Sequence, residues 1–191
     1  MANVNSPFGL RPVRRRDGAP WNGVFTKRLI QNAFATSVYR GDLIVYNTSG
    51  YMTRFANGGA IADGVFWGCN YLDSVSGTRV WSPYYPASVA ATGDIEMDVI
   101  EDPNLLFEIQ ADNTTPTIAI IGANTDITAT AGSTANGLSA EVAAIGSVNT
   151  TATFPLRIVG FSAEPDNDTA SPYARLLVQL NTTGSRVALG I

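Results

Sequence analysis

The 191-residue sequence contains no histidine, one cysteine (Cys69) and one lysine (Lys27). Without histidine, the chain cannot form a Ser-His-Asp or Cys-His catalytic pair, or any metal site with an imidazole ligand. A single cysteine excludes a disulfide within the chain and a zinc site of several cysteines. Lys27 is the one candidate for a Schiff-base or phosphate-loop lysine, but its neighbours Phe25, Thr26 and Arg28 do not match a phosphate loop. The composition therefore predicts a protein that is not an enzyme.

Charge and long apolar runs are also scarce. Charged residues make up 15% of the chain and apolar residues 45%, whereas typical soluble domains have about 25% charged residues. This apolar content suffices for a buried core, and the length fits one domain. The longest apolar runs, such as Ile118–Ile121, are too short to span a bilayer, and the first seven residues lack the apolar segment of a signal peptide. We expect a protein made in the cytosol, with no membrane partner and no cofactor.

Short strands separated by turn residues are predicted from about residue 29 onward. The strand-like segments are 43–46, 51–55, 64–71, 78–81, 94–100, 105–110, 154–161 and 173–180. Glycine, proline and threonine are abundant, which disfavours long helices. We expect one helical turn near 139–145, with Ser139 as its cap. The predicted fold is mainly β, an antiparallel β-barrel or jelly-roll-like domain with less than about 15% helix.

Two groups of carboxylates with two-residue spacing could bear chemistry: Asp94, Glu96 and Asp98 in one, and Glu164, Asp166 and Asp168 in the other. Paired carboxylates can hydrolyse glycosides, and clusters of oxygen ligands can bind calcium. Alternating acids on the solvated face of a strand are commoner, because they keep the sheet soluble. Pro165 and Asn167 indicate a turn in the second group. We therefore assign no catalytic and no metal-binding residue, and we interpret Cys69 as a small core residue.

Charge is distributed unevenly along the chain. Residues 1–28 have a net charge of +5, and residues 29–191 have a net charge of −9. Prolines and glycines in the first segment favour an extended path, but its aromatic residues make it too apolar for a solvated tail. We predict an extended basic arm, residues 1–28, that lies against its own domain, a neighbouring subunit or a nucleic acid. A single β-rich domain, residues 29–191, follows. The candidate binding residues of the arm are Phe8, Arg11, Arg14, Arg15, Arg16, Trp21, Phe25, Lys27 and Arg28.

Residues 113–156 contain only two charged side chains, Asp126 and Glu141. Isoleucine, leucine and valine recur too often in this segment for a flexible linker. We expect weakly charged strands that pack inside the domain or against a neighbouring subunit, because a surface with little charge costs little to desolvate.

Four segments, in this order, resemble small structural proteins encoded beside the capsid genes of tailed phages. They are Asn5–Arg14 (followed by Asp17-Gly18 and Trp21-Asn22-Gly23), Glu101–Asp112, Asn136–Glu141 and Phe154–Phe161 (followed by Pro165-Asp166-Asn167). The resemblance implies a capsid decoration (head cement) protein that binds the outside of an icosahedral shell. Relatives often have a histidine after the early arginine, where this chain has Arg14-Arg15-Arg16.

The resemblance also implies partners and a location. The partners would be the major capsid protein and other copies of this chain, as a homotrimer in preference to a homodimer. The protein would assemble in the host bacterial cytoplasm and end on the outer surface of the head, with the basic arm as its grip on the shell.

Two alternatives stay open from the residues alone. One is a glycan-binding protein of the tail or fibre, which needs an exposed aromatic platform; the candidates are Trp67, Trp81, Tyr84 and Tyr85. The other is an internal head protein that binds nucleic acid through the arginines of the arm. The net charge of −9 on residues 29–191 would repel a nucleic acid, so we expect no nucleic-acid partner.

Overall fold

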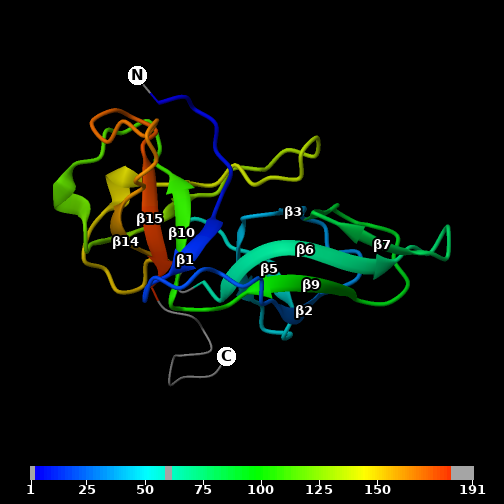
Figure 1. Ribbon diagram of the computed structural model, residues 1–191. Coiled ribbons are helices and arrows are strands. Elements are labelled where there is room, and N and C mark those ends of the chain that lie inside the picture. Colours follow the sequence, from blue (N-terminus) through cyan, green and yellow to red (C-terminus); the bar gives the residue numbers. More distant parts are fainter. Residues whose placement is uncertain (1–2, 59–61, 182–191) are drawn as a thin grey trace.

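The computed structural model describes residues 3–58 and 62–181 (Figure 1). The protein is mainly β, with 40% strand, 3% helix and antiparallel sheets, as the sequence predicted. Among the described residues no sheet closes into a barrel, and the arrangement is compatible with a β-sandwich or jelly roll. In the same part of the chain, no helix has the length and apolarity that a membrane span requires.

The strands form two larger sheets and two short ladders. The five-stranded sheet has the order β1 (Arg11–Arg15), β10 (Leu105–Gln110), β15 (Arg175–Leu180), β14 (Leu156–Phe161) and β11 (Asn124–Thr125). The six-stranded sheet has the order β2 (Thr26–Ile30), β9 (Ile95–Ile100), β6 (Gly64–Leu72), β4 (Leu43–Tyr46) and β5 (Met52–Arg54), with β7 (Arg79–Ser82) paired to β6. The ladders pair β3 (Val38–Tyr39) with β8 (Tyr84–Tyr85) and β12 (Ile127–Thr128) with β13 (Val142–Ala143). The 3-10 helices are η1 (Ile118–Ile120) and η2 (Ile145–Ser147).

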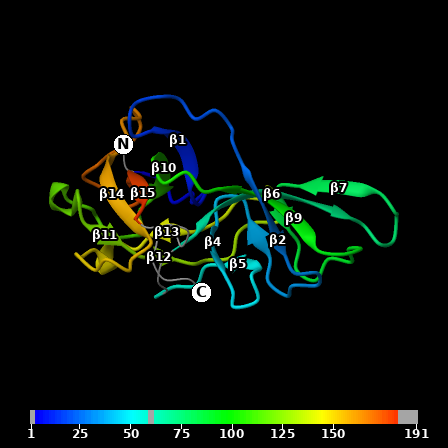
Figure 2. The same ribbon diagram turned by 90° about the horizontal axis from the view of Figure 1, so that it is seen from below.

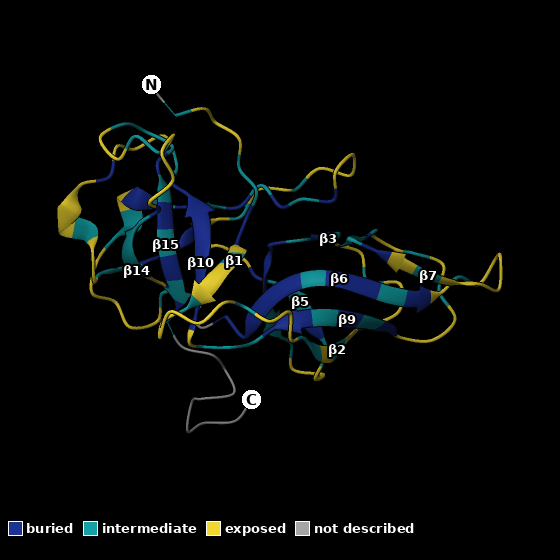
Figure 3. Cartoon of the chain, viewed as in Figure 1, coloured by how far each residue is buried: buried dark blue, intermediate teal, exposed yellow. Residues whose placement is uncertain are grey.

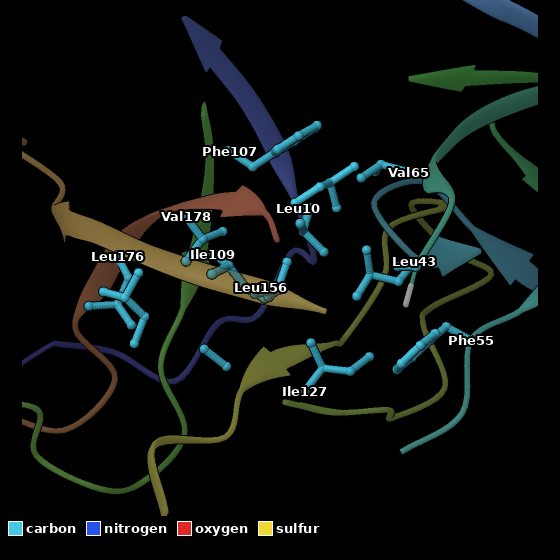
Figure 4. Close-up of a cluster of buried hydrophobic side chains, with 14 of the residues drawn as sticks. Leu10, Leu43, Phe55, Val65, Phe107, Ile109, Ile127, Leu156, Leu176 and Val178 are labelled. Carbon is cyan, nitrogen blue, oxygen red and sulfur yellow. The ribbon is translucent and has the colours of Figure 1, made fainter. Parts of the chain in front are cut away.

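The two larger sheets lie side by side as two lobes (Figures 1 and 2). One apolar core joins them: Leu10, Phe107 and Leu156 of the five-stranded lobe share a cluster with Leu43 and Val65 of the other sheet (Figure 4). Burying each such side chain contributes about 1.5–3 kcal/mol relative to leaving it exposed. The shared core therefore fixes the two lobes against each other.

A second apolar core lies within the six-stranded lobe, and it includes Phe66, Cys69 and Met97. The sheet curls around this core, so that β2 and β5, which stand at opposite ends of the strand order, come into contact. The hydroxyl of Tyr51, next to β5, donates a hydrogen bond to Asp94, next to β9, at 2.8 Å. The sheet is thus curved like a barrel, but in the described part of the chain no ladder of backbone hydrogen bonds joins β2 to β5.

Residues 1–28 are built into both sheets. β1 is the edge strand of the five-stranded sheet, where Arg11 pairs with Glu108 and Arg15 with Leu105. β2 is the edge strand of the six-stranded sheet, and Leu10 before β1 is 1% exposed in the shared core. The predicted boundary between arm and domain, at residue 28, therefore falls inside a strand. Prolines and glycines rule out a helix in this segment, but they permit edge strands, which need backbone partners on one side only.

The strand predictions based on local periodicity agree with the structure. The predicted hairpin between 43 and 55 forms from β4 and β5, and the alternating segment 94–100 forms β9, with Ile95, Met97 and Val99 buried. The predicted helical turn at 139–145 is wrong. Ser139 is buried and its Oγ accepts a hydrogen bond from the Glu141 amide, which leads into strand β13.

Residues 113–156 are mostly loops with three two-residue strands, β11, β12 and β13. The only two charges of this segment, Asp126 and Glu141, are buried. Asp126 accepts a hydrogen bond from the Gly58 amide at 2.7 Å. The exposed surface of this segment (yellow in Figure 3) therefore has no charged side chain.

Candidate interaction surface

Most positive charges of residues 1–28 meet carboxylates of the same chain. Four of the six cations form such ion pairs: Arg11 with Glu108, Arg15 with Asp102, Lys27 with Glu96 and Asp98, and Arg28 with Glu101. Arg28 is bidentate, with Nε and Nη2 donating to Glu101 at 2.6 and 2.7 Å. The hydrogen bond that the Lys27 ammonium donates to Asp98, at 2.5 Å, raises the pKa of Lys27. These residues therefore hold β1 and β2 in place, a role that net charge alone did not predict.

Arg14 and Arg16 differ from the other cations of this segment. Both side chains are exposed, and within the described part of the chain neither forms an ion pair with a carboxylate. Arg16 donates a weak hydrogen bond of 3.3 Å to Gln179. Val13 stands between Arg11 and Arg14 at an irregularity of β1 and is 43% exposed. The outer side of β1 thus combines uncompensated positive charge with exposed apolar surface.

The connection from β1 to β2, and β2 itself, have further exposed apolar side chains. Val24 is 65% exposed and Leu29 is 47% exposed. Val24 borders an open groove of about 400 Å³, which is also lined by Arg15, Trp21, Asn22, Thr26, Glu101 and Asp102. We call residues 11–29 together with this groove the N-terminal surface. The backbone of these residues passes from the five-stranded lobe to the six-stranded lobe (Figure 2).

The aromatic residues predicted to anchor the arm in a partner instead pack within the chain. Trp21 contacts Phe25 and Trp67 edge to face, with ring centroids 5.5 and 5.4 Å apart. Phe25 stacks on Trp67 at 6.4 Å. Phe8 lies under the Arg11 guanidinium, 5.0 Å from the ring centroid. The three rings are therefore part of the fold, and the one ring among them that lines the groove is Trp21.

The contacts among Trp21, Phe25 and Trp67 are followed by further ring contacts across the six-stranded sheet. The Arg40 guanidinium lies 5.1 Å from the Trp67 ring and 5.7 Å from the Trp81 ring. Trp81 is 52% exposed, and a Cβ added to Gly68 would approach its ring to 3.0 Å, so the indole lies close over this glycine. Of the other candidates for an aromatic platform, Tyr85 is fully buried and Tyr84 stacks on Tyr39.

A buried charge cluster, which was not predicted from the sequence, ties the β4–β5 hairpin to residues 130–141. Arg54 lies between two fully buried carboxylates, with Nε 3.0 Å from Asp42 and Nη2 3.3 Å from Glu141. Asp42 also accepts a hydrogen bond from the Tyr39 amide, and Glu141 accepts one from the Leu43 amide. Burial raises the pKa of Asp42 to about 6, and burial together with the nearby Asp42 charge raises the pKa of Glu141. The cluster is structural, because its groups face one another in the interior.

The carboxylate groups singled out in the sequence bind partners within the chain. Asp94 accepts hydrogen bonds from Tyr51 and from the Asn32 amide, and Asp166 pairs with Arg175. Across residues 3–58 and 62–181, no group of three or more acidic or sulfur ligands comes together as a metal site. Cys69 is fully buried, as predicted for a core residue.

The four segments singled out in the sequence converge in space. Asn5–Arg14 contains Leu10 and most of β1, Glu101–Asp112 contains β10, and Phe154–Phe161 contains β14, so all three contribute to the five-stranded sheet. Asn136–Glu141 joins them at Ser139, which lies against Gly9. Comparisons with protein-family models, with curated proteins and with solved structures find no match to this chain.

Proposed function

We propose that this chain is a non-catalytic structural protein that binds the outer surface of an icosahedral phage capsid and stabilises it. The observation that carries the proposal is the N-terminal surface, which combines the exposed Arg14 and Arg16 with the exposed apolar side chains of Val13, Val24 and Leu29. Surfaces that combine arginine with apolar side chains are typical of protein interfaces. The resemblance of four segments to proteins encoded beside capsid genes supports this class of function.

The proposed partner is the major capsid protein, met through acidic groups and apolar surface on the outside of the assembled head. An exposed arginine contributes about 1 kcal/mol or less, so one copy would bind weakly through charge alone. Several copies held together, as a homotrimer or a homodimer, would bind far more tightly, because each attached copy keeps the others near their sites. This fits assembly in the bacterial cytoplasm before release of the virion.

The test is to add the protein to bare shells formed from the coat protein of the same phage. Truncation is uninformative, because removing residues 1–28 deletes β1 and the buried Leu10. The double substitution Arg14→Glu and Arg16→Glu changes only exposed charges. We expect it to weaken attachment about tenfold or more, because two favourable contacts become repulsive.

The matched control is Arg79→Glu with Arg157→Glu, two exposed arginines outside the N-terminal surface. We expect the control to occupy shells as the wild type does. No attachment by the wild type would contradict the proposal. Equal losses of attachment in both double variants would contradict the assignment of the contact to the N-terminal surface. Added salt should weaken attachment only in part, because apolar contacts remain.

A second candidate function, a glycan-binding protein of the tail or fibre, is favoured by Trp81. Strand pairing puts Asn70 between Trp81 and Glu96 on neighbouring strands. An exposed indole beside an amide and a carboxylate is suited to the apolar face and the hydroxyls of a sugar ring. Tryptophan fluorescence titrated with host surface oligosaccharides tests this candidate: a saturable change that Trp81→Ala abolishes would support it, and no change would reject it.

A further inference from the structure

The end of the five-stranded lobe farthest from the six-stranded sheet has a surface of unusual composition. It consists of residues 113–122, which include η1, and residues 149–153; we call it the uncharged end (left in Figure 1). The two parts are joined through Asn124, whose backbone exchanges hydrogen bonds with Asn149 at 2.8 and 3.0 Å and whose side chain donates to the Thr151 carbonyl at 3.0 Å. The uncharged end is therefore one surface and not two separate loops.

Large apolar side chains project from this surface. Ile118 is 80% exposed, Ile121 is 41% exposed, and η1 contains no buried residue. Leaving such side chains in water costs free energy that burial in an interface would recover. Within η1, Ile120 packs against the shared core, whereas Ile118 points into solvent, so the fold itself does not require isoleucine at position 118.

The polar groups of the uncharged end are hydroxyls and amides. The exposed polar side chains are those of Asn113, Thr114, Thr115, Thr117, Asn149, Thr150, Thr151 and Thr153. The nearest charged side chains along the chain that are not buried, Asp112 and Arg157, lie at its border. Hydroxyl and amide groups both donate and accept hydrogen bonds, so a surface made of them can pair with an identical surface. A charged group cannot pair with its own copy.

We infer that the uncharged end is a contact between copies of this chain, in which Ile118 and Ile121 of one copy are buried against a second copy. The whole chain has a net charge of −4, so two copies repel unless they meet where charge is absent. A strongly charged partner would gain no ion pair here and would lose its hydration. A symmetric homotypic contact fits this composition.

The inference is independent of capsid binding, and sedimentation velocity of the full chain over a concentration series tests it. We expect reversible association of the wild type in the micromolar range, since the surface is smaller than the 20–30 residues of a standard interface. The double substitution Ile118→Asp and Ile121→Asp should raise the dissociation constant about tenfold or more, because it places like charges opposite each other.

Val75→Asp is the matched control, because Val75 is 87% exposed in the turn between β6 and β7 on the other lobe. It should associate as the wild type does. Thr151→Lys supplies an independent variant that adds charge without removing an apolar side chain, and it should weaken association too. A wild type that stays monomeric to about 100 µM, or equal effects of Val75→Asp and the isoleucine variant, would overturn the inference.

Discussion

Replacing Arg54 by methionine perturbs the buried charge cluster while preserving most of the apolar stem of the side chain. The substitution leaves Asp42 and Glu141, both 0% exposed, without their shared cation. Removing one partner of a buried ion pair costs about 3–5 kcal/mol, because an uncompensated charge stays in the interior. This is a large part of the 5–15 kcal/mol that typically stabilises a domain. We expect a loss of about 3 kcal/mol or more near neutral pH.

The loss should depend on pH in a defined direction. The pKa of Asp42 is raised from 3.8 to about 6 in the folded protein, so the folded state binds this proton more tightly than the unfolded state does. The stabilising contribution is therefore complete below about pH 4 and is lost as the pH rises through about 6. A shift of this size corresponds to about 3 kcal/mol. Removing Arg54 raises both carboxyl pKa values further, so the variant should recover much of its stability near pH 5.

The assay is urea denaturation followed by circular dichroism at about pH 5 and about pH 7, with Arg157→Met as an exposed control that should change stability by less than about 0.5 kcal/mol. Adding Asp42→Asn and Glu141→Gln to Arg54→Met should restore part of the stability at the higher pH, because no charge then remains within the cluster. A loss below about 1 kcal/mol at pH 7, or an equal loss at both pH values, would refute the role given to the cluster.

Two further predictions concern packing. Gly9→Ala should destabilise the fold by about 2 kcal/mol or more in urea denaturation, because Gly9 has φ +69° and an added Cβ would lie 2.5 Å from Ser139 Cβ. Gly77→Ala, at φ +67° with open space around it, should cost less, and equal losses would contradict the clash. Cys69 should resist Ellman's reagent near pH 8 until the chain unfolds, because burial raises the pKa of its thiol to about 12. Rapid labelling of the folded protein would contradict this.

The sequence predicted those parts of the fold that depend on local periodicity. Alternation in 94–100 and turn residues between 46 and 51 determine β9 and the β4–β5 hairpin through neighbouring residues alone. The assignment of β1 and β2 to two different sheets depends on pairing with β10 and β9, far along the chain. Such pairings leave no local pattern, which is why residues 1–28 read as a separate arm.

The candidate surface was predictable in its residue types but not in its pairings. The cations of residues 1–28 are evident from composition, whereas the partner that distinguishes Arg28 from Arg14 is Glu101, far along the chain. Asp42 and Arg54 meet through the β4–β5 hairpin, but Glu141, 87 residues beyond Arg54, joins them only in the tertiary structure. A lone acid in a long uncharged segment, such as Glu141, was the one available signal that a buried cation is needed to compensate it.

The most direct test of the central claim is an electron cryomicroscopy reconstruction of the assembled phage head. We expect density for the two β lobes on the outside of the shell, with Arg14 and Arg16 toward the coat protein and the uncharged end toward a second copy of the chain. Density for this chain inside the shell or on the tail, or its absence from the particle, would contradict the proposed function.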